Sequence, residues 1–249
     1  MRGEGAVRPL EDYHSAMAHL PRVTPEALLR RRRLMVVAPH PDDESLGLGG
    51  LIAATRALGL PVVVVFLTDG ERSHVDSPTW PVARLAAQRR AEAFAALAIL
   101  GVGAAGAHFL GLGDTQLADL DSHQCKAAAW QLAAFATSDT LVCVTAPTDP
   151  HSDHQIAAAL VREAPWPAGV EIMHYPVWTW MRPVHELPAT PPLGVRVAID
   201  PHSPCKCAAI AAHRSQHGQL IHDASEAFVL DPAFLDHFTG PTETLLWPR

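Results

Sequence analysis

Cysteine is scarce in this chain of 249 residues, and its four cysteines include no Cys-x-x-Cys pair. A disulfide framework or a thiolate zinc site needs more cysteines, or closer spacing between them. The N-terminal segment also lacks an apolar stretch of the length found in secretory signals. We therefore expect reduced thiols and a cytoplasmic protein.

Long apolar runs are missing as well. The longest run, residues 93–107, is interrupted by three glycines and falls short of the ~18–20 residues that a membrane span requires. We therefore expect no membrane span. With 48% hydrophobic and 18% charged residues, the composition is that of a globular protein with a substantial core.

The chain also has no excess of positive charge. It holds 19 Lys and Arg against 26 Asp and Glu, a formal net charge of −7. Seven of the arginines fall within residues 1–33, so the remaining chain is more acidic still. Because nucleic-acid binding requires a basic surface, we expect no nucleic-acid partner.

Short apolar runs alternate with helix-like segments along the chain. Strands are expected at residues 34–38, 62–67, 141–145 and 195–199. Helices are expected at residues 47–58, 84–100, 123–136, 155–162 and 204–216. The run Val62–Leu67 is mostly β-branched and does not alternate with polar residues, which is typical of strands buried on both faces of a parallel sheet. The order predicts an α/β, Rossmann-like fold with a mostly parallel sheet and helices on both faces.

The expected organisation is one domain with an N-terminal extension. Residues 1–33 are assigned to an arm, irregular over residues 1–23, that ends in a short helix beginning at Thr24-Pro25. Residues 34–249 are assigned to a single domain because no internal repeat or low-complexity linker divides them. The sequence leaves open whether the chain forms a homo-oligomer.

Histidine is abundant, with 15 residues, and it meets carboxylates in the loop after the first expected strand. There His40 precedes Asp42, Asp43 and Glu44. Adjacent carboxylates repel one another and stay ionised together only near a cation or a helix N-terminus. An acidic first turn of a helix explains part of this cluster, but it does not explain a histidine between two prolines.

A second loop of the same kind follows the expected strand at residues 141–145. It contains His151, Asp153 and His154, and a helix follows it. Ligands bind at the carboxyl ends of the strands in parallel sheets, so the two loops are expected to meet. Histidine and carboxylate are ordinary zinc ligands. The spacing therefore predicts a metal site between the two loops.

These loops resemble signatures of the LmbE-like, or PIG-L, family of zinc-dependent N-acetylglucosaminyl deacetylases. Residues 39–44 (PHPDDE) resemble the family's (A)HPDDE motif, and residues 151–154 (HSDH) resemble its H-x-D-H motif. Weaker matches follow in the family's order at residues 68–71, Arg90-x-Glu92, residues 112–114, Lys206 and residues 213–216. The resemblance spans about residues 34–219 and departs from the common pattern at Pro39 and Ser152.

The resemblance implies a set of roles for the two loops. It implies three ligands to a Zn²⁺ ion: His40, Asp43 and His154. Three protein ligands leave positions for water and substrate. Asp42 is implied as the general base toward that water, and His151 as a group that stabilises the oxyanion together with zinc. Asp153 is implied to orient His151 and to keep it protonated.

Each of the other candidate residues has two interpretations, one functional and one structural. Arg72 and Asp114 either contact sugar hydroxyls or a negative aglycone, or are ordinary surface charges. Glu44 and Gln216 either support the zinc ligands from behind, or are a favourable first-turn acid and a polar helix end. The aromatic group of His174, Tyr175, Trp178 and Trp180 either stacks on a sugar ring or packs in the core.

The resemblance implies amide hydrolysis with release of acetate from an N-acetylglucosamine-type unit of a small glycoside or glycoconjugate. Two alternatives remain. A non-haem Fe(II) oxygenase also uses two histidines and one carboxylate, although alternating β-strands are expected around its ligands. A non-catalytic metal- or sugar-binding module on the same fold has no need of Asp42 and His151.

Overall fold

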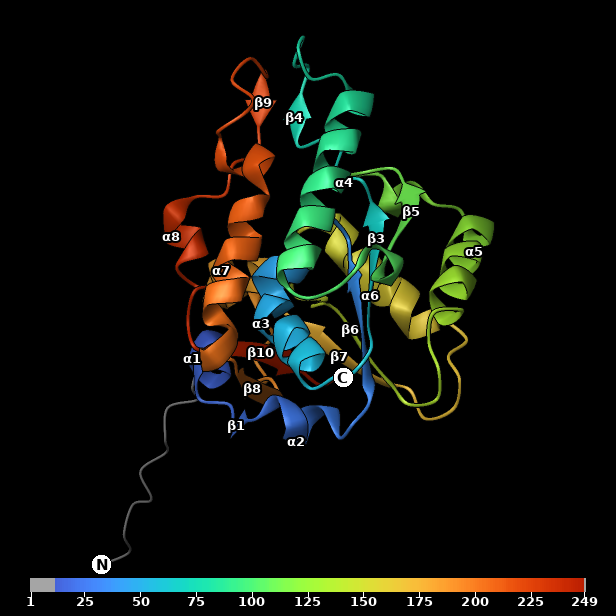
Figure 1. Ribbon diagram of the computed structural model, residues 1–249, viewed down its shortest axis with the longest axis vertical. Helices are drawn as coiled ribbons and strands as arrows, with labels where there is room; N and C mark the ends of the chain where they lie inside the picture. The colour runs from blue at the N-terminus through green and yellow to red at the C-terminus, as the bar shows by residue number, and fades with distance from the viewer. Residues whose placement is uncertain (1–11, 249) are drawn as a thin grey trace, which may run out of the picture.

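The computed structural model describes residues 12–248, and a central sheet organises them (Figure 1). The strand order in this sheet is β1-β8-β10-β7-β6-β2-β3-β5. The strands are β1 (Arg22–Val23), β2 (Arg33–Ala38), β3 (Val62–Thr68), β5 (Ala107–Leu112), β6 (Thr140–Thr145), β7 (Glu171–Tyr175), β8 (Gly194–Ala198) and β10 (Thr242–Leu246). All neighbours pair in parallel except β10, which is antiparallel to both β7 and β8. The predicted mostly parallel α/β sheet is confirmed.

Helices cover both faces of this sheet. They are α1 (Tyr13–Ala18), α2 (Pro25–Leu29), α3 (Asp43–Ala57), α4 (Val82–Ile99), α5 (Ser122–Ala133), α6 (Ser152–Glu163), α7 (Ser203–Ala212) and α8 (Pro232–Leu235). Successive residues of β2 point to opposite faces of the sheet. Val36 packs into the core under α3, α4 and α7, whereas Met35 and Val37 pack into the core under α5 and α6. The two cores hold the sheet between two helical layers.

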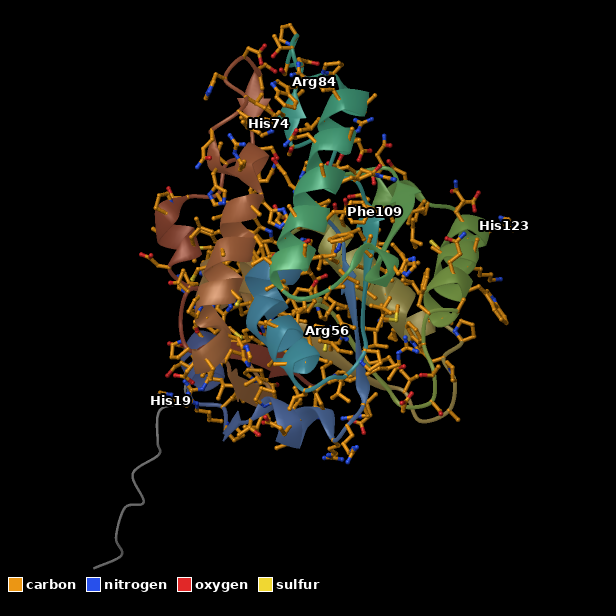
Figure 2. The ribbon with its side chains drawn as sticks, in the orientation of Figure 1. His19, Arg56, His74, Arg84, Phe109 and His123 are labelled. Atoms are coloured by element: carbon orange, nitrogen blue, oxygen red, sulfur yellow. The ribbon has the colours of Figure 1, made fainter. Side chains whose placement is uncertain are left out.

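The edge strand β5 is held by aromatic packing. Phe109 lies on β5 beside α4 (Figure 2) and stacks on Phe66 of β3 at a centroid distance of 4.7 Å. Phe94 of α4 meets the same ring at 5.6 Å. Phe94 thus packs α4 against the outer strand of the sheet.

The N-terminal part differs from its prediction. Asp12 caps α1 by accepting a hydrogen bond from the backbone N–H of Ser15, and β1 pairs in parallel with β8 through Arg22 and Arg196. The interpretation of residues 1–23 as an irregular arm is therefore wrong for residues 13–23, while residues 1–11 lie outside the described part. The short helix at Thr24-Pro25 is confirmed as α2.

Helix α3 begins at Asp43, earlier than the expected residue 47, so its acidic residues occupy the first turn. The expected final helix is also shorter, because α7 ends at Ala212 and residues 214–217 form a separate 3₁₀ turn. A small ribbon, β4 (His74–Val75) with β9 (Glu226–Ala227), stands apart from the main sheet (Figure 1). None of the helices formed by residues 12–248 combines the length and apolar character that a membrane crossing needs.

Candidate metal centre and active site

The two predicted loops meet at the carboxyl end of the sheet. One follows β2 and enters α3, and the other follows the neighbouring strand β6 and enters α6. A cavity of about 360 Å³ lies above them. Residues from both loops line its floor: His40, Asp42, Asp43 and His151. The topology thus brings together side chains that lie more than a hundred positions apart in the chain.

Three side chains of the two loops, those of His40, Asp43 and His154, offer candidate ligand atoms close to one another. The Oδ2 atom of Asp43 lies 3.4 Å from Nδ1 of His40 and 3.4 Å from Nε2 of His154. Ligand atoms about 2.1 Å from a tetrahedral zinc ion lie about 3.4 Å from one another. Both distances therefore fit a zinc ion, and the three ligand atoms all lie within 4.8 Å of one another. A second grouping with metal-ligand spacing, His40, His151 and Asp153, shares His40 with the first.

A buried carboxylate behind His154 orients its ring. Its Nδ1 lies 2.8 Å from Oδ2 of Asp149, and both side chains are fully buried. Asp149 is itself held by the backbone N–H groups of Val177 and Thr179. Nε2 of His154 is buried without a hydrogen-bond partner among the described residues. An imidazole bound in this way presents the lone pair of Nε2 to a metal.

Two carboxylates orient His40 in the same manner. Its Nε2 lies 3.1 Å from Oδ2 of Asp153 and 3.2 Å from Oδ1 of Asp114, which leaves Nδ1 facing Asp43. Burial alone would lower the pKa of His40, but its hydrogen bonds to the carboxylates of Asp114 and Asp153 outweigh burial and raise the pKa well above its ordinary value. These two acids therefore position a proposed ligand.

The ionisation of His154 and that of Asp43 depend on each other. Burial would lower the pKa of His154, but the charge of Asp43 and the hydrogen bond that His154 donates to Asp149 raise it to about 9. Burial would likewise raise the pKa of Asp43, but His154 and His40 hold it well below its usual range. Without a metal, protons on the imidazoles balance the carboxylate, and a divalent cation supplies the same positive charge.

The implied role of Asp153 toward His151 is not the one that the structure shows. The carboxylate of Asp153 binds His40 and the backbone N–H groups of Thr115 and Leu117. His151 is held instead by the backbone N–H of Asp153, which donates to Nδ1 at 3.2 Å. Burial and the neighbouring imidazoles lower the pKa of His151 to about 4, so it is neutral rather than protonated at neutral pH. This expectation was wrong because one residue's carboxylate and amide point in different directions.

Asp42 stands beside the three ligand groups in an unusual backbone conformation. Its φ of 142° lies in a region that non-glycine residues rarely occupy, and its carboxylate does not cap α3. Burial raises the pKa of Asp42 to about 6, against the opposing charge of Arg89. A carboxylate with this pKa is poised to exchange protons near neutral pH.

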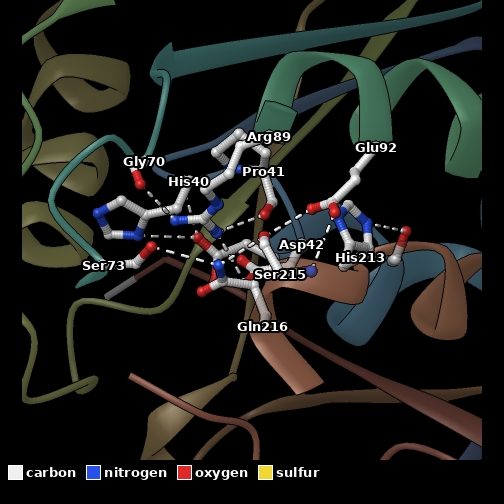
Figure 3. A network of polar contacts seen from close by, with 12 residues as sticks. His40, Pro41, Asp42, Gly70, Ser73, Arg89, Glu92, His213, Ser215 and Gln216 are labelled. Carbon is white, nitrogen blue, oxygen red and sulfur yellow. Dashed lines mark hydrogen bonds and ion pairs between the residues drawn. The ribbon is translucent and has the colours of Figure 1, made fainter. Parts of the chain in front are cut away.

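Arg89 of α4 fixes this turn from outside. Its guanidinium donates to Oδ2 of Asp42 at 3.0 Å and to the carbonyl oxygens of Pro41 and Gly70 (Figure 3). A Cβ at Gly70 would lie 2.1 Å from Nη1 of Arg89, so only glycine leaves room for the guanidinium. The sequence pattern had singled out Arg90, which instead pairs with Asp69 at 2.7 Å, partly exposed. The buried arginine is its neighbour.

Glu44 and Gln216 support the turn and the cavity wall respectively. Glu44 is fully buried and accepts a hydrogen bond from the backbone N–H of Asp42 at 3.0 Å, while its other oxygen faces His213. Gln216 donates to Ser73 of the cavity wall and to Ser215, which Glu92 binds in turn (Figure 3). Glu44 thus holds the backbone of Asp42, whereas Gln216 belongs to a hydrogen-bond network farther from the candidate metal ligands.

The remaining candidates are distributed around the cavity. Arg72 is exposed and lines it, and its backbone N–H donates to Asp114 at 2.7 Å. Of the aromatic group, Trp178 lines the cavity. Tyr175 is buried in the core and donates to the carbonyl of Val37. His174 and Trp180 lie elsewhere, against a second cavity and His237 respectively.

Sequence reasoning missed Asp149 and Arg89. Asp149 carried a weak signal, because it lies in the same strand-to-helix loop as the predicted histidines. Arg89 carried none, because a buried arginine on an amphipathic helix has the same spacing as a solvated one.

Comparisons with known proteins agree with this geometry. A 1D-myo-inositol 2-acetamido-2-deoxy-alpha-D-glucopyranoside deacetylase from Mycobacterium sp. (strain KMS) is 36% identical over 160 residues, which cover 54% of this chain and 51% of that protein. A diacetylchitobiose deacetylase from Thermococcus kodakarensis is 37% identical over 86 residues, covering 34% of this chain and 31% of that protein. The chain thus spans about half the length of these curated relatives, or less.

A solved structure supports the fold. The N,N'-diacetylchitobiose deacetylase from Pyrococcus horikoshii superposes with a TM-score of 0.59 at 22% identity, covering 84% of this chain and 81% of that chain. The profile of the family described as GlcNAc-PI de-N-acetylase (PIG-L) matches residues 35–165, more than half of the chain, including both proposed ligand loops. The chain therefore belongs to the PIG-L family.

Proposed function

We propose that this protein is a zinc-dependent hydrolase that removes the acetyl group from an N-acetylglucosamine-type unit of a small glycoside or glycoconjugate. One observation carries the proposal: Oδ2 of Asp43 lies 3.4 Å from a ring nitrogen of His40 and 3.4 Å from one of His154, and the neighbouring residue, Asp42, has a buried carboxylate with a raised pKa. The named activities of the curated relatives support the choice of N-acetyl sugar. A cavity of about 360 Å³ is of the size that holds a small molecule.

Zinc would be held by Nδ1 of His40, Oδ2 of Asp43 and Nε2 of His154. Zinc at such a site lowers the pKa of bound water and polarises an amide carbonyl. The protein's own contribution is to fix the two histidine ligands through Asp149, Asp153 and Asp114, all of which are buried.

Asp42 acts as the general base and then as the general acid. It accepts a proton from the attacking water as the water oxygen bonds to the acetyl carbon. It then returns that proton to the amide nitrogen as the C–N bond breaks, which releases acetate and a free amine. Arg89 and Glu44 hold Asp42 in place for both transfers.

His151 stabilises the oxyanion as a neutral group. Because Nδ1 accepts a hydrogen bond from the backbone, the proton of the neutral ring sits on Nε2. Nε2–H is then available to donate to the acetyl oxygen as negative charge develops there. This role needs no positive charge on the imidazole, in agreement with its lowered pKa.

The two alternatives are less well supported. The ligand groups of iron oxygenases were expected among alternating β-strands, whereas here they follow parallel strands that lead into helices. A binding module has no need of the strained conformation at Asp42 or of a neutral imidazole in the same cavity.

The proposal is tested by acetate release from N-acetylglucosaminides by the zinc-loaded protein, with and without a chelator. Asp42→Asn is expected to lower kcat by about 10³-fold or more while zinc content stays at the level of the unaltered chain. Asp69→Asn, at the end of the neighbouring strand, is the matched control. Absence of acetate from every such substrate, or undiminished turnover in Asp42→Asn, would refute the proposal. Oxygen uptake by the iron-loaded protein would favour the oxygenase.

A further inference from the structure

The cavity above the proposed metal centre has an inner and an outer part with different chemistry. Its floor is polar and almost inaccessible, with His40, Asp42 and Asp43 at 9%, 5% and 2% exposure. The outer part is lined largely by apolar side chains, here called the outer wall: Val75, Trp178, Ala227, Phe228 and Leu230. A substrate whose acetyl group reaches the floor places its remaining atoms against the outer wall.

Apart from Trp178, the outer wall is built from two segments that lie about 150 positions apart. Strands β4 and β9 pair in antiparallel register, and the backbone N–H of Phe228 donates to the carbonyl of Ser73 at 2.8 Å. Farther along, the carboxylate of Asp223 accepts hydrogen bonds from Ser77 and from the backbone of Thr79. These bonds hold the two segments in one fixed arrangement.

Gln216 ties both segments to the core. Its side-chain amide donates to Oγ of Ser73 at 3.2 Å, and its backbone carbonyl accepts from the N–H of Leu230 at 2.8 Å. Gln216 is fully buried. The outer wall is therefore formed before a ligand arrives, and a preformed surface loses little conformational freedom on binding.

Two aromatic rings form the largest surfaces of the outer wall. Trp178 and Phe228 meet edge to face at a centroid distance of 5.5 Å, and Phe234 stacks on Trp178 at 4.3 Å. Trp178 and Phe228 are only partly buried, and both line the cavity. Aromatic rings fixed in this way offer flat apolar surfaces to a ligand ring.

Charge at the rim is balanced. Arg72 and Glu226 line the cavity, both are exposed, and they carry opposite signs. A ligand with a strong charge of either sign therefore meets one attractive and one repulsive group there. An uncharged ligand avoids this conflict and still gains the apolar contacts.

We propose that the outer wall is a subsite for the aglycone, and that it selects an uncharged ring with an apolar face, either a second pyranose or an aryl group. This inference rests on the proposed deacetylase function and goes beyond it by naming the class of substrate. The contacts with Trp178 and Phe228 bind the aglycone without touching the reacting amide, so they act on specificity.

The test compares kcat/KM for acetate release by the zinc-loaded protein from four compounds: N-acetylglucosamine, N-acetylglucosamine 1-phosphate, N,N'-diacetylchitobiose and p-nitrophenyl N-acetyl-β-glucosaminide. We expect at least one of the two ring-bearing compounds to exceed both the free sugar and the phosphate by about tenfold or more. Which ring-bearing compound is preferred tells a pyranose aglycone from an aryl one.

Variants of the outer wall link this preference to the structure. Phe228→Ala and Val75→Ser are expected to bring the ratio of kcat/KM between the preferred compound and the free sugar toward one. Val75 is exposed, so its substitution keeps the test valid if Phe228→Ala unfolds. Trp130→Ala, on the exposed side of α5, is the matched aromatic control and should leave the ratio unchanged.

The possible results separate the two proposals. Turnover that does not depend on the aglycone, a preference for the phosphate, or a ratio unaffected by both variants overturns the aglycone subsite and leaves the deacetylase function standing. Absence of acetate from all four compounds overturns the proposed function, and the subsite with it.

Discussion

The Nδ1 atom of His154 lies 2.8 Å from Oδ2 of Asp149, and this contact leaves the opposite ring nitrogen facing Asp43. Both residues of the pair are fully buried. The tautomer and the orientation of a proposed ligand therefore depend on a carboxylate five positions earlier in the same loop.

Asp149→Asn is expected to weaken zinc binding by about 10–100-fold, because the amide is a poorer acceptor for Nδ1–H and reduces the basicity of Nε2. Zinc affinity is measured by competition with a chromophoric chelator, alongside thermal unfolding. Asp69→Asn should bind zinc as the unaltered chain does. Unchanged zinc affinity in a folded Asp149→Asn protein would contradict the assigned role.

The pH dependence of turnover should reflect Asp42. Its pKa is raised to about 6, and bound zinc adds a positive charge that lowers it, so kcat/KM should fall as the pH drops below a midpoint at or under about 6. Removing the guanidinium in Arg89→Gln removes an opposite charge and should move this midpoint upward by about 1 unit. Zinc content measured at each pH distinguishes titration of Asp42 from loss of metal. A midpoint that moves downward would contradict the assignment.

The metal-free protein should lose stability in alkaline solution. The pKa of His154 is raised to about 9, so its stabilising contribution is complete below about pH 6.5 and is lost as the pH rises through 9. Zinc binds the neutral imidazole, so the zinc-loaded protein should lack this loss. Thermal midpoints of chelator-treated and zinc-loaded protein between pH 6.5 and 9.5 provide the measurement. Metal-free His154→Gln should show a weaker alkaline loss than the metal-free unaltered chain, and an equal loss would count against this origin.

Close packing of α3 on the sheet should make Gly47 intolerant of a side chain. A Cβ at Gly47 would lie 2.2 Å from Cδ2 of the buried Tyr175. Gly47→Ala should therefore destabilise the fold by about 1–3 kcal/mol in denaturant unfolding. Gly103→Ala is the matched control, because no atom lies within 4 Å of its Cβ position. Equal stability of the two variants would show that the helix can shift at little cost.

Local patterns predicted four of the parallel strands, β2, β3, β6 and β8, but not β1, β5 or β7. The strand at Val62–Leu67 was recognisable because a strand buried on both faces has no polar alternation, and the structure extends it only to Thr68. Strand β10 was not predicted. Its residues, Thr242–Leu246, include Glu243, whose carboxylate is buried against Lys206 and the backbone of α3. The sequence alone does not distinguish a buried charged residue from an exposed one, because its burial depends on a partner elsewhere in the chain.

The candidate site could likewise be predicted only in part. The two loops could be predicted because strand-to-helix turns in parallel sheets converge, and the spacing of His40 and His154 on separate loops suited one ion. What could not be predicted was which atom of a residue faces which neighbour. Asp153 illustrates this, since its carboxylate serves His40 and its backbone amide serves His151.

The position of β10 has a consequence for how the molecule assembles. In the strand order, β8 and β1 join the rest of the sheet only through β10. During synthesis from the N-terminus, β2, β3, β5, β6 and β7 can pair as soon as residue 175 has left the ribosome, and all three proposed ligands are then present. The β8 and β1 side must wait for residues 242–246. A nascent chain at that stage would already hold all three proposed ligands while one side of the sheet remained unpaired.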